Sequence, residues 1–391
     1  MLMSAPQPQA LRFPTLALDQ VIDALDRWPA DREPVVNFAP GQSSFNVWEA
    51  LGQTPPALPV ERVVRYGELS GSSLLRERIS QGLSHRLGVS ISPRQVCITN
   101  GGSEAIMLAL HLLMRPGGRL LMSESCYPGY RPLHRFFAAE RRPVALRPDC
   151  TLDVAALQAQ WGSGREAAGS VLLVNSPSNP FGTVLSAPEL AELASLPMPI
   201  IFDEVYQPLS LGDEPVPSAM VHTDRHFVVG SFAKSLAVPG LRLGYLISPL
   251  QWADEIVNIK ALVSVCSSSA AQHVMEHLLL HWDELEAQHR RHLRRSHDHF
   301  FGVCRRLGLP LMSRPQAGLF ATLALPRSAP LDSLSVALEL ALHHGIGVVP
   351  STDFQDQGPG FLRMNFSIAH DLVEPGLERL AAALRSLDCQ V

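Results

Sequence analysis

The sequence predicts an α/β fold, in which helices flank a mostly parallel sheet and a smaller α+β domain accompanies it. Two observations lead to this prediction. Short apolar runs, several of them rich in β-branched residues, alternate with helix-like segments, as in parallel strands that are covered on both faces. The chain also has 391 residues, 46% of them hydrophobic, which is enough for a large core and for two domains.

The expected strands are short apolar runs bounded by turn residues. A helix is expected at 101–114, directly after the first of these runs, and one long charged helix is expected at 275–306. The runs that we expect to form strands are 95–99, 119–124, 170–175, 199–204, 226–231 and 243–248, followed by 320–325 and 345–349.

The domain organisation follows from the point at which this alternation ends. Near residue 280 the alternating pattern gives way to the long charged helix, so we expect a large domain at about 51–280. A small domain is expected to combine 281–391 with an N-terminal arm, 1–50, because the proline-rich segment 53–59 resembles a linker. No internal repeat or low-complexity segment interrupts the pattern.

Composition excludes several classes of partner. The net charge is −5 and the chain has no basic tail, so we expect no nucleic-acid binding. The N-terminus does not read as a signal peptide, and no apolar stretch approaches the roughly 20 residues that a bilayer requires, so we expect no membrane contact. The six cysteines are scattered without a CxxC pair, which indicates free thiols in a reducing cytoplasm.

Lysine is rare in this sequence. Only Lys234 and Lys260 occur, against 30 arginines, and lysine can do what arginine cannot: lose its proton and attack a carbonyl. Lys234 lies in the segment GSFAKSLAVPGLRLGY (230–245), in a turn after an expected strand. Ser231 and Arg242 flank it and can bind a phosphate, so the segment fits a pyridoxal phosphate site. An incidental lysine in a surface loop is the alternative.

The segment TNGGSEAI (99–106) places two glycines between a strand and a helix. Free N–H groups and the helix dipole make such a turn an anion site, with Gly102 and Ser103 as the best phosphate donors. An ordinary capped helix start explains the same residues.

Polar residues also follow two other strands. Asp203 ends an apolar strand, where a carboxylate requires a cationic partner such as a protonated pyridine nitrogen, and Tyr206 can reach the neighbouring ring oxygen. Asn179 precedes a proline, which holds it outside a helix, and its amide can bond the same oxygen and a substrate carboxylate. A turn cap at Asp203 and a plain Asn-Pro turn at Asn179 are the alternatives.

Two further residues complete the candidate site. Tyr127, in SCYPGY (125–130), can stack on a pyridine ring or serve as a core aromatic. Arg363 lies in an apolar strand-like run, where a buried arginine requires an anionic partner. That partner is either a substrate carboxylate or an aspartate or glutamate of the same chain.

Together these blocks resemble the class I/II aminotransferase family of fold-type-I pyridoxal phosphate enzymes. The resemblance runs from about Gly41 to the C-terminus, and the segment 231–245 is its most specific part. It implies a mostly parallel seven-stranded sheet in the large domain, pyridoxal 5'-phosphate as cofactor, and transfer of an amino group between an L-amino acid and a 2-oxo acid. The matching blocks also occur in the right order: GGSEAI, CYPGY, NSPSNPFG, FDEVY, SFAK and LRMNF.

The resemblance implies a role for each cofactor residue. Lys234 would form the internal aldimine and then carry the proton, while Asp203 would pair with the pyridine nitrogen and stabilise a quinonoid. Tyr206 and Asn179 would bond the 3-oxygen, and Tyr127 would stack on the ring. The residues implied to hold the phosphate are Gly102, Ser103, Ser231 and Arg242.

The resemblance also implies substrate and subunit contacts. Arg363 would bind the substrate α-carboxylate, together with Asn179 and the backbone at Gly41. Tyr66 would reach the phosphate of a neighbouring subunit, which implies a homodimer. The sequence departs from the family where Phe181 replaces the usual threonine of Asn-Pro-Thr-Gly, and where Ser351 replaces a frequent glycine. Both departures lie where the shape of the substrate is set, so the sequence does not identify the substrate's side chain.

Three other interpretations remain open from the sequence. A lyase, cyclase or oxidase of amino-acid-derived substrates would use the same scaffold and the same cofactor residues. An effector-binding domain of a transcription regulator would carry a DNA-binding domain ahead of the matching region, where only about 35 residues are present. The histidines of the long helix, from His277 to His299, can also be imagined as zinc ligands, but a solvated helix is the simpler explanation and we predict no metal.

Overall fold

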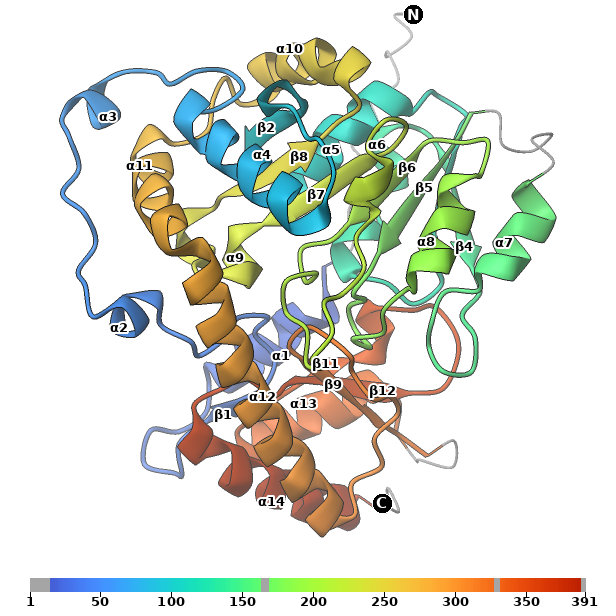
Figure 1. The fold of residues 1–391 in the computed structure, drawn as a ribbon. Helices are drawn as coiled ribbons and strands as arrows, with labels where there is room; N and C mark the ends of the chain where they lie inside the picture. Colours follow the sequence, from blue (N-terminus) through green and yellow to red (C-terminus); the bar gives the residue numbers. More distant parts are fainter. Residues whose placement is uncertain (1–14, 163–168, 327–330, 388–391) are drawn as a thin grey trace, which may run out of the picture.

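A seven-stranded sheet forms the centre of the larger half of the molecule (Figure 1). In this computed structural model, which describes residues 15–162, 169–326 and 331–387, the strand order is β2–β8–β7–β6–β5–β3–β4. All neighbours from β7 to β4 pair in parallel, whereas β8 is antiparallel to both β2 and β7. The predicted mostly parallel seven-stranded sheet is therefore confirmed. Its strands are β2 (Val96–Thr99), β3 (Arg119–Ser123), β4 (Glu140–Val144), β5 (Ser170–Asn175), β6 (Ile200–Asp203), β7 (Phe227–Ser231) and β8 (Gly244–Ile247).

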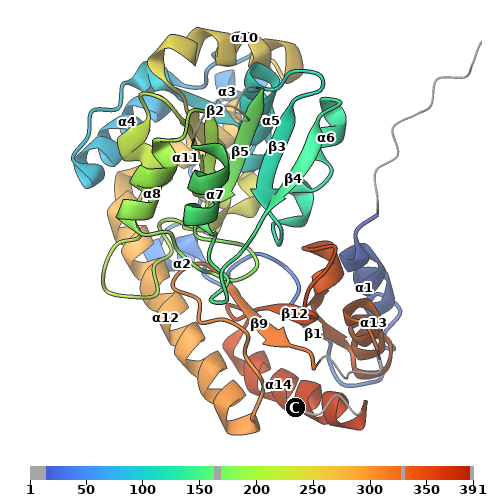
Figure 2. The same cartoon turned by 90° about the vertical axis from the view of Figure 1, so that its right-hand side faces the viewer.

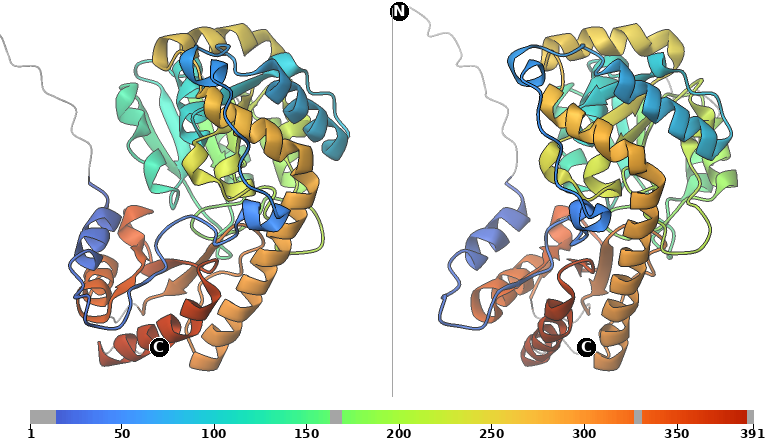
Figure 3. Two further views of the ribbon diagram at one scale, coloured as in Figure 1. Left: turned by 90° about the vertical axis from the view of Figure 1, so that its left-hand side faces the viewer. Right: turned by 60° about the vertical axis from the view of Figure 1, so that its left-hand side comes forward.

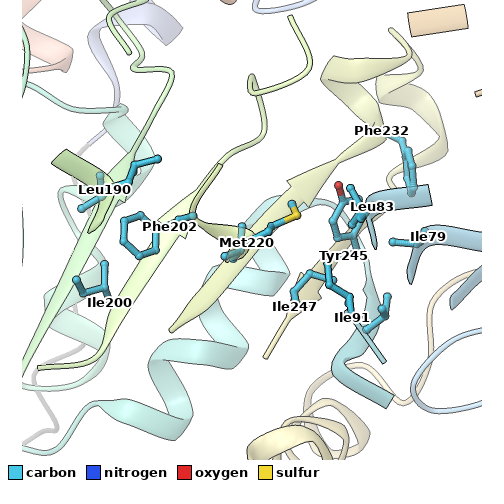
Figure 4. Close-up of a cluster of buried hydrophobic side chains, with 14 of the residues drawn as sticks. Ile79, Leu83, Ile91, Leu190, Ile200, Phe202, Met220, Phe232, Tyr245 and Ile247 are labelled. Carbon is cyan, nitrogen blue, oxygen red and sulfur yellow. The ribbon is translucent and has the colours of Figure 1, made fainter. Parts of the chain in front are cut away.

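The apolar runs form strands because both faces of this sheet are covered. Along β5, Val171 and Leu173 pack on one side with helix α5, while Leu172 and Val174 pack on the other side. Figure 4 shows part of this second core, where Phe202 and Ile200 of β6 lie near Leu190 of α8. The helices of this half are α3 (Glu61–Val64), α4 (Ser73–Leu87), α5 (Gly102–Leu113), α6 (Leu133–Phe136), α7 (Val154–Trp161), α8 (Ala187–Ala194), α9 (Phe232–Ser235), α10 (Ala253–Val263) and α11 (Ser269–Leu278).

The smaller half combines both ends of the chain around a second core (Figure 2). An antiparallel sheet has the order β11–β12–β9, and a short strand near the N-terminus, β1, pairs in parallel with β10. The elements are α1 (Ala17–Leu25), β1 (Val36–Asn37), β9 (Phe320–Ala324), α13 (Ser333–His344), β10 (Ile346–Gly347), β11 (Val349–Pro350), β12 (Phe361–Asn365) and α14 (His370–Ser386). Helix α2 (Val47–Leu51) instead packs against the core of the larger half. Residues before the linker and after residue 300 thus share one core.

Helix α12 (Trp282–Leu307) runs from one half of the molecule to the other (Figure 3). The prediction of a single helix over 275–306 is wrong, because α11 ends at Leu278 and a 3-10 turn, Leu279–His281, separates it from α12. The break lets Trp282 pack against α4, where a Cβ on Gly82 would lie 2.8 Å from the indole ring. None of the helices in the described ranges is long and apolar enough to cross a membrane.

Strand β4 was absent from the predicted strands. Its residues include two arginines and a proline, and its side chains are mostly exposed, so no apolar run marks it. It forms because β3 offers a parallel edge, with Arg119 opposite Glu140 and Ser123 opposite Val144. The strand is therefore determined by pairing and not by its own composition.

Candidate active site

A cavity of about 270 Å³ lies at the carboxyl ends of the central parallel strands. Asn175 ends β5, Asp203 ends β6 and Ser231 ends β7, so the sheet brings three polar residues to one edge. Nine residues that the sequence predicted for the cofactor line this cavity: Gly102, Ser103, Tyr127, Asn179, Asp203, Tyr206, Ser231, Lys234 and Arg242.

Lys234 projects into this cavity from α9, immediately after β7. Its Nζ donates a hydrogen bond to the carbonyl oxygen of Gly41, so the arm of the smaller half touches the lysine. Burial, together with the nearby guanidinium groups of Arg363 and Arg242, lowers the pKa of Lys234 to about 8, although the charge on Asp203 opposes the shift. A larger fraction of the amine is therefore neutral near pH 7 than for an ordinary lysine.

Asp203 is buried opposite this lysine and forms no ion pair with any described residue. Tyr130 donates its hydroxyl hydrogen to the carboxylate, and the N–H of Val205 donates at 3.1 Å. Burial raises the pKa of Asp203 to about 6, although both hydrogen bonds and the charge on Lys234 oppose the shift. Within the described ranges Asp203 forms no ion pair, so a cation that entered the cavity beside it would be stabilised.

The start of α5 and the side chain of Arg242 form a cradle on one side of the cavity. Gly101 has a φ of +81°, and a Cβ there would lie 2.9 Å from the Arg242 guanidinium. A Cβ on Gly102 would lie 3.1 Å from Val205, and one on Gly244 would lie 2.9 Å from the backbone of Gly101. The backbone can therefore approach an anion here, where N–H groups of the first helical turn lack intrahelical partners.

Tyr206 and Asn179 lie together on another wall. The Asn179 side chain lies beside the Tyr206 hydroxyl, and its buried Oδ1 has no hydrogen-bond partner among the described residues. The N–H of Asn179 donates to Asn175 Oδ1 at 2.8 Å, which fixes this segment to the end of β5. Tyr127 lies edge-on to Tyr130, with 5.3 Å between ring centroids and 79° between planes. An unsatisfied buried amide beside a phenol is suited to a polar ring substituent.

Arg363 extends from β12 near this site and is buried between two aromatic rings. Its guanidinium carbon lies 4.1 Å from the Phe320 ring centroid and 5.6 Å from that of Phe354. It donates to the carbonyl of Ala39, and its Nε has no hydrogen-bond partner among the described residues. Burial lowers its pKa to about 10. No aspartate or glutamate in the described ranges forms an ion pair with it, so the intramolecular alternative is not observed.

Three residues that the sequence analysis missed support this arrangement. Tyr130 holds Asp203, and Asn175 donates to the Asp203 carbonyl oxygen at 3.0 Å. Asn365 donates to the carbonyls of Pro40 and Gln42 at 2.7 and 2.6 Å, so it holds the arm on both sides of Gly41. The sequence contained a signal for both asparagines, because each is a polar residue at the end of an apolar strand.

Tyr66 does not reach the cavity of its own chain. Its side chain is 87% exposed, and it lies in the segment between α3 and α4 on the outside of the larger half. The cavity is lined without it.

The histidines predicted in the long helix each contact a different part of the chain. His289 is buried, its Nδ1 lies 2.8 Å from the Ser235 carbonyl oxygen, and its ring stacks on Phe45 at 4.7 Å. His292 Nε2 lies 3.0 Å from Ser44 Oγ, and His277 bonds Gln53 at 2.9 Å. Among the described residues no group of three histidine, cysteine or acidic side chains is placed to hold a metal. His289 and His292 thus join α12 to the N-terminal arm, whereas His277 lies in α11 and contacts the linker.

The sheet, its strand-end cavity and the lysine after β7 define an α/β enzyme of fold type I. The chain belongs to the class I and II aminotransferase family, whose model matches residues 33–380. It is 27% identical to valine–pyruvate aminotransferase of Mycobacterium tuberculosis, over 93% of this chain and 96% of that protein. It is 25% identical to aspartate/prephenate aminotransferase of Thermus thermophilus, over 90% and 91% respectively.

Solved structures agree with this assignment at the level of the fold. The crystal structure of aspartate aminotransferase from Thermotoga maritima superimposes with a TM-score of 0.83 at 22% identity, covering 95% of this chain and 98% of that one. The protein is an aminotransferase, and the comparisons favour this activity over the lyase, cyclase and oxidase alternatives.

The raised pKa of Asp203 predicts a pH-dependent cost of folding for the apoprotein. The folded pKa is about 6 against an ordinary value of 3.8, so the cost is small below pH 3.8, grows as the pH rises and is complete above pH 6. Asp203→Asn should therefore raise the free energy of unfolding at pH 8 by up to about 3 kcal/mol. The gain should shrink at pH 4.5, as measured by urea unfolding.

Asp213→Asn is the matched control, because the Asp213 side chain is 96% exposed. It should change stability little at either pH. An Asp203→Asn effect that is the same at pH 8 and pH 4.5 would contradict a cost that arises from the buried charge.

Proposed function

We propose that this aminotransferase uses pyridoxal 5'-phosphate and Lys234 to move an amino group between an L-amino acid and a 2-oxo acid. One observation carries the proposal: a lysine with a lowered pKa and a buried, unpaired carboxylate face the same cavity beside an anion cradle. When bound, the cofactor supplies an aldehyde that condenses with amines and a ring that accepts electrons from the substrate.

The residues present fit this cofactor. Asp203 would accept a hydrogen bond from the protonated pyridine nitrogen, whose positive charge offsets the cost of burying the carboxylate. Asn179 and Tyr206 would bond the 3-oxygen, which fits the unpaired Oδ1 and the adjacent phenol, and Tyr127 would cover the ring. The phosphate would be held by Gly102, Ser103, Ser231 and Arg242.

Lys234 would also move a proton. A neutral Nζ can accept the proton that leaves the substrate Cα, and the lowered pKa keeps part of the amine neutral at pH 7. The Gly41 carbonyl, which accepts a hydrogen bond from Nζ, would orient the amine. The arm would thus couple substrate binding to the position of the base.

Arg363 would bind the α-carboxylate of the substrate. Its buried Nε has no partner, and a carboxylate would supply the anion that a buried guanidinium requires. The backbone at Gly41 and the amide of Asn179 would complete the carboxylate site, since Asn365 holds the arm close to Arg363.

A second copy of the chain would complete the site. Tyr66 lies in a surface that exposes many apolar side chains, which is typical of a permanent subunit interface. We propose a homodimer in which Tyr66 reaches the phosphate of the neighbouring active site. The exposed apolar residues near Tyr66 and at the end of α10 are Leu58, Val60, Val63, Val64, Leu69, Leu262, Val263 and Val265.

The thiols support a reducing compartment. The five cysteines in the described part of the chain are free. Burial raises the pKa of Cys97, Cys126 and Cys304 to about 12, so these side chains remain unreactive thiols. We infer that the enzyme works in the cytoplasm.

Replacing Lys234 tests the central assignment. Borohydride treatment of wild type with pyridoxal phosphate should attach the cofactor covalently to Lys234, as shown by mass spectrometry of peptides. Lys234→Ala should take up no covalent label and lose transamination by at least about 10³-fold, because the amine that moves the proton is gone. Label on Lys260, or equal labelling of the variant, would refute the assignment.

Replacing Arg363 tests the carboxylate site. Arg363→Met should lower kcat/KM for amino acids by about 10²-fold or more, because charge-assisted hydrogen bonds to the carboxylate are lost. Turnover of the corresponding amines, which lack this carboxylate, should change little. Arg306→Met is the control, because Arg306 is half-exposed and pairs with Glu374. Equal losses for acids and amines would exclude the carboxylate role.

Mixed dimers test whether Tyr66 acts across subunits. Lys234→Ala and Tyr66→Ala chains, refolded together, should form a dimer in which one site has both intact residues, so activity should return to about half per mixed dimer. A mixture of Lys234→Ala with Asp203→Asn should recover nothing, since both residues act within one chain. A monomer in solution, or no recovery with Tyr66→Ala, would contradict the proposal.

A further inference from the structure

Lys260, the second of the two lysines, is fully buried in α10. Its exposed fraction is 0%, and its Nζ donates to Glu104 at 2.9 Å and to Ser264 Oγ at 3.0 Å. The Glu104 side chain is only 9% exposed. Burying such a pair is costly unless its remaining hydrogen bonds are satisfied, so its position calls for an explanation.

Glu104 lies in the first turn of α5, the same turn that borders the anion cradle. It accepts the N–H of Asn100 at 2.6 Å and the Asn100 side chain at 3.2 Å. Burial alone would raise the pKa of Glu104, but hydrogen bonds from Ser264, Lys260 and Asn100 outweigh it and lower the pKa. The carboxylate is therefore ionised and fixed to the residue that precedes Gly101.

The turn at Gly101 is held from both sides. Thr99 Oγ1 donates to the Gly101 carbonyl at 2.9 Å, and Arg242 lies against Gly101 on the cavity side. On the other side, Glu104 fixes Asn100 through two hydrogen bonds. Gly101 needs its φ of +81° to make this turn, and the hydrogen bonds at Asn100 and at the Gly101 carbonyl fix the turn that leads into the N–H groups of α5.

We propose that Lys260 is a positioning residue for the cofactor phosphate, acting through Glu104. The ammonium group balances a carboxylate that would otherwise stand, uncompensated, in the helical turn that receives the phosphate dianion. The carboxylate in turn fixes Asn100 and the Gly101 turn. This inference rests on the proposed function, since it assumes that a phosphate occupies the cradle.

A buried ion pair that only stabilises the fold would behave differently. Breaking such a pair would lower the affinity for every ligand of the cavity by a similar factor, because the whole folded state would be destabilised. A positioning role concerns the phosphate alone. Pyridoxal, which lacks the phosphate but keeps the ring and the aldehyde, separates the two.

The experiment compares the dissociation constants of pyridoxal phosphate and pyridoxal for apoenzyme variants at pH 8. The measured quantity is the dissociation constant of pyridoxal phosphate divided by that of pyridoxal. In Lys260→Met this ratio should rise about tenfold or more, because an uncompensated carboxylate repels the phosphate. In Glu104→Gln, the amide oxygen can still accept from Asn100 while Lys260 keeps its charge. The uncompensated ammonium group of Lys260 should then favour the phosphate, so the ratio should fall, opposite in sign to its change in Lys260→Met.

Ile256→Ala is the matched control for lost stability. Ile256 is fully buried in the same helix, packs in the same core as α5 and has no polar link to the turn. It should leave the ratio unchanged. If Lys260→Met does not fold, Glu104→Gln and the double variant decide, because the double variant should return the ratio to near the wild-type value.

Two results would overturn the inference. One is a ratio that is the same in wild type, Lys260→Met and Glu104→Gln. The other is a ratio that moves in the same direction in both single variants. Wild-type protein that binds neither compound would instead refute the proposed function, and with it this inference, whereas binding by wild type with no change in the ratio refutes the inference alone.

Discussion

Burial of charged groups without counter-ions at one edge of the sheet is the constraint on which the site depends. Burial disfavours the charged forms of Asp203, Lys234 and Arg363, whose pKa values shift to about 6, 8 and 10. No ion pair within the described chain offsets these costs. Groups of opposite charge that entered the cavity would offset these costs. We propose that the cofactor and the substrate carboxylate are those groups.

The smaller half contributes to the same edge through the arm at Gly41. Asn365 of β12 holds the arm, the arm contacts Lys234, and His289 joins Ser235 to Phe45. The residue after the lysine and the arm that contacts it are thus both tied to α12. A substrate carboxylate at Arg363 would sit within this set of contacts, so closure of the arm and orientation of the amine would be linked.

The sequence predicted those parts of the molecule that local pattern determines. Lys234 and Asp203 could be placed because each follows an apolar strand, and parallel strands end at one edge. Strand β4 and the break before Trp282 could not be predicted, since they depend on an edge at β3 and on a contact with Gly82. Tyr130 was missed for the same reason: only the folded chain brings it to Asp203, 73 residues away.

The two lysines differ because of the carboxylates around them. Lys260 has Glu104 within hydrogen-bond distance, and the pair is neutral overall, so the turn at Gly101 carries no net charge to oppose a phosphate. In the described part of the chain no carboxylate lies within hydrogen-bond distance of Lys234, and Asp203 is held by Tyr130 and Val205 instead of by the amine. If Asp203 paired with Lys234, it would hold the amine protonated and leave no acceptor for a pyridine nitrogen. In the proposed function, the separation of these two charges would leave each of them free to interact with the cofactor.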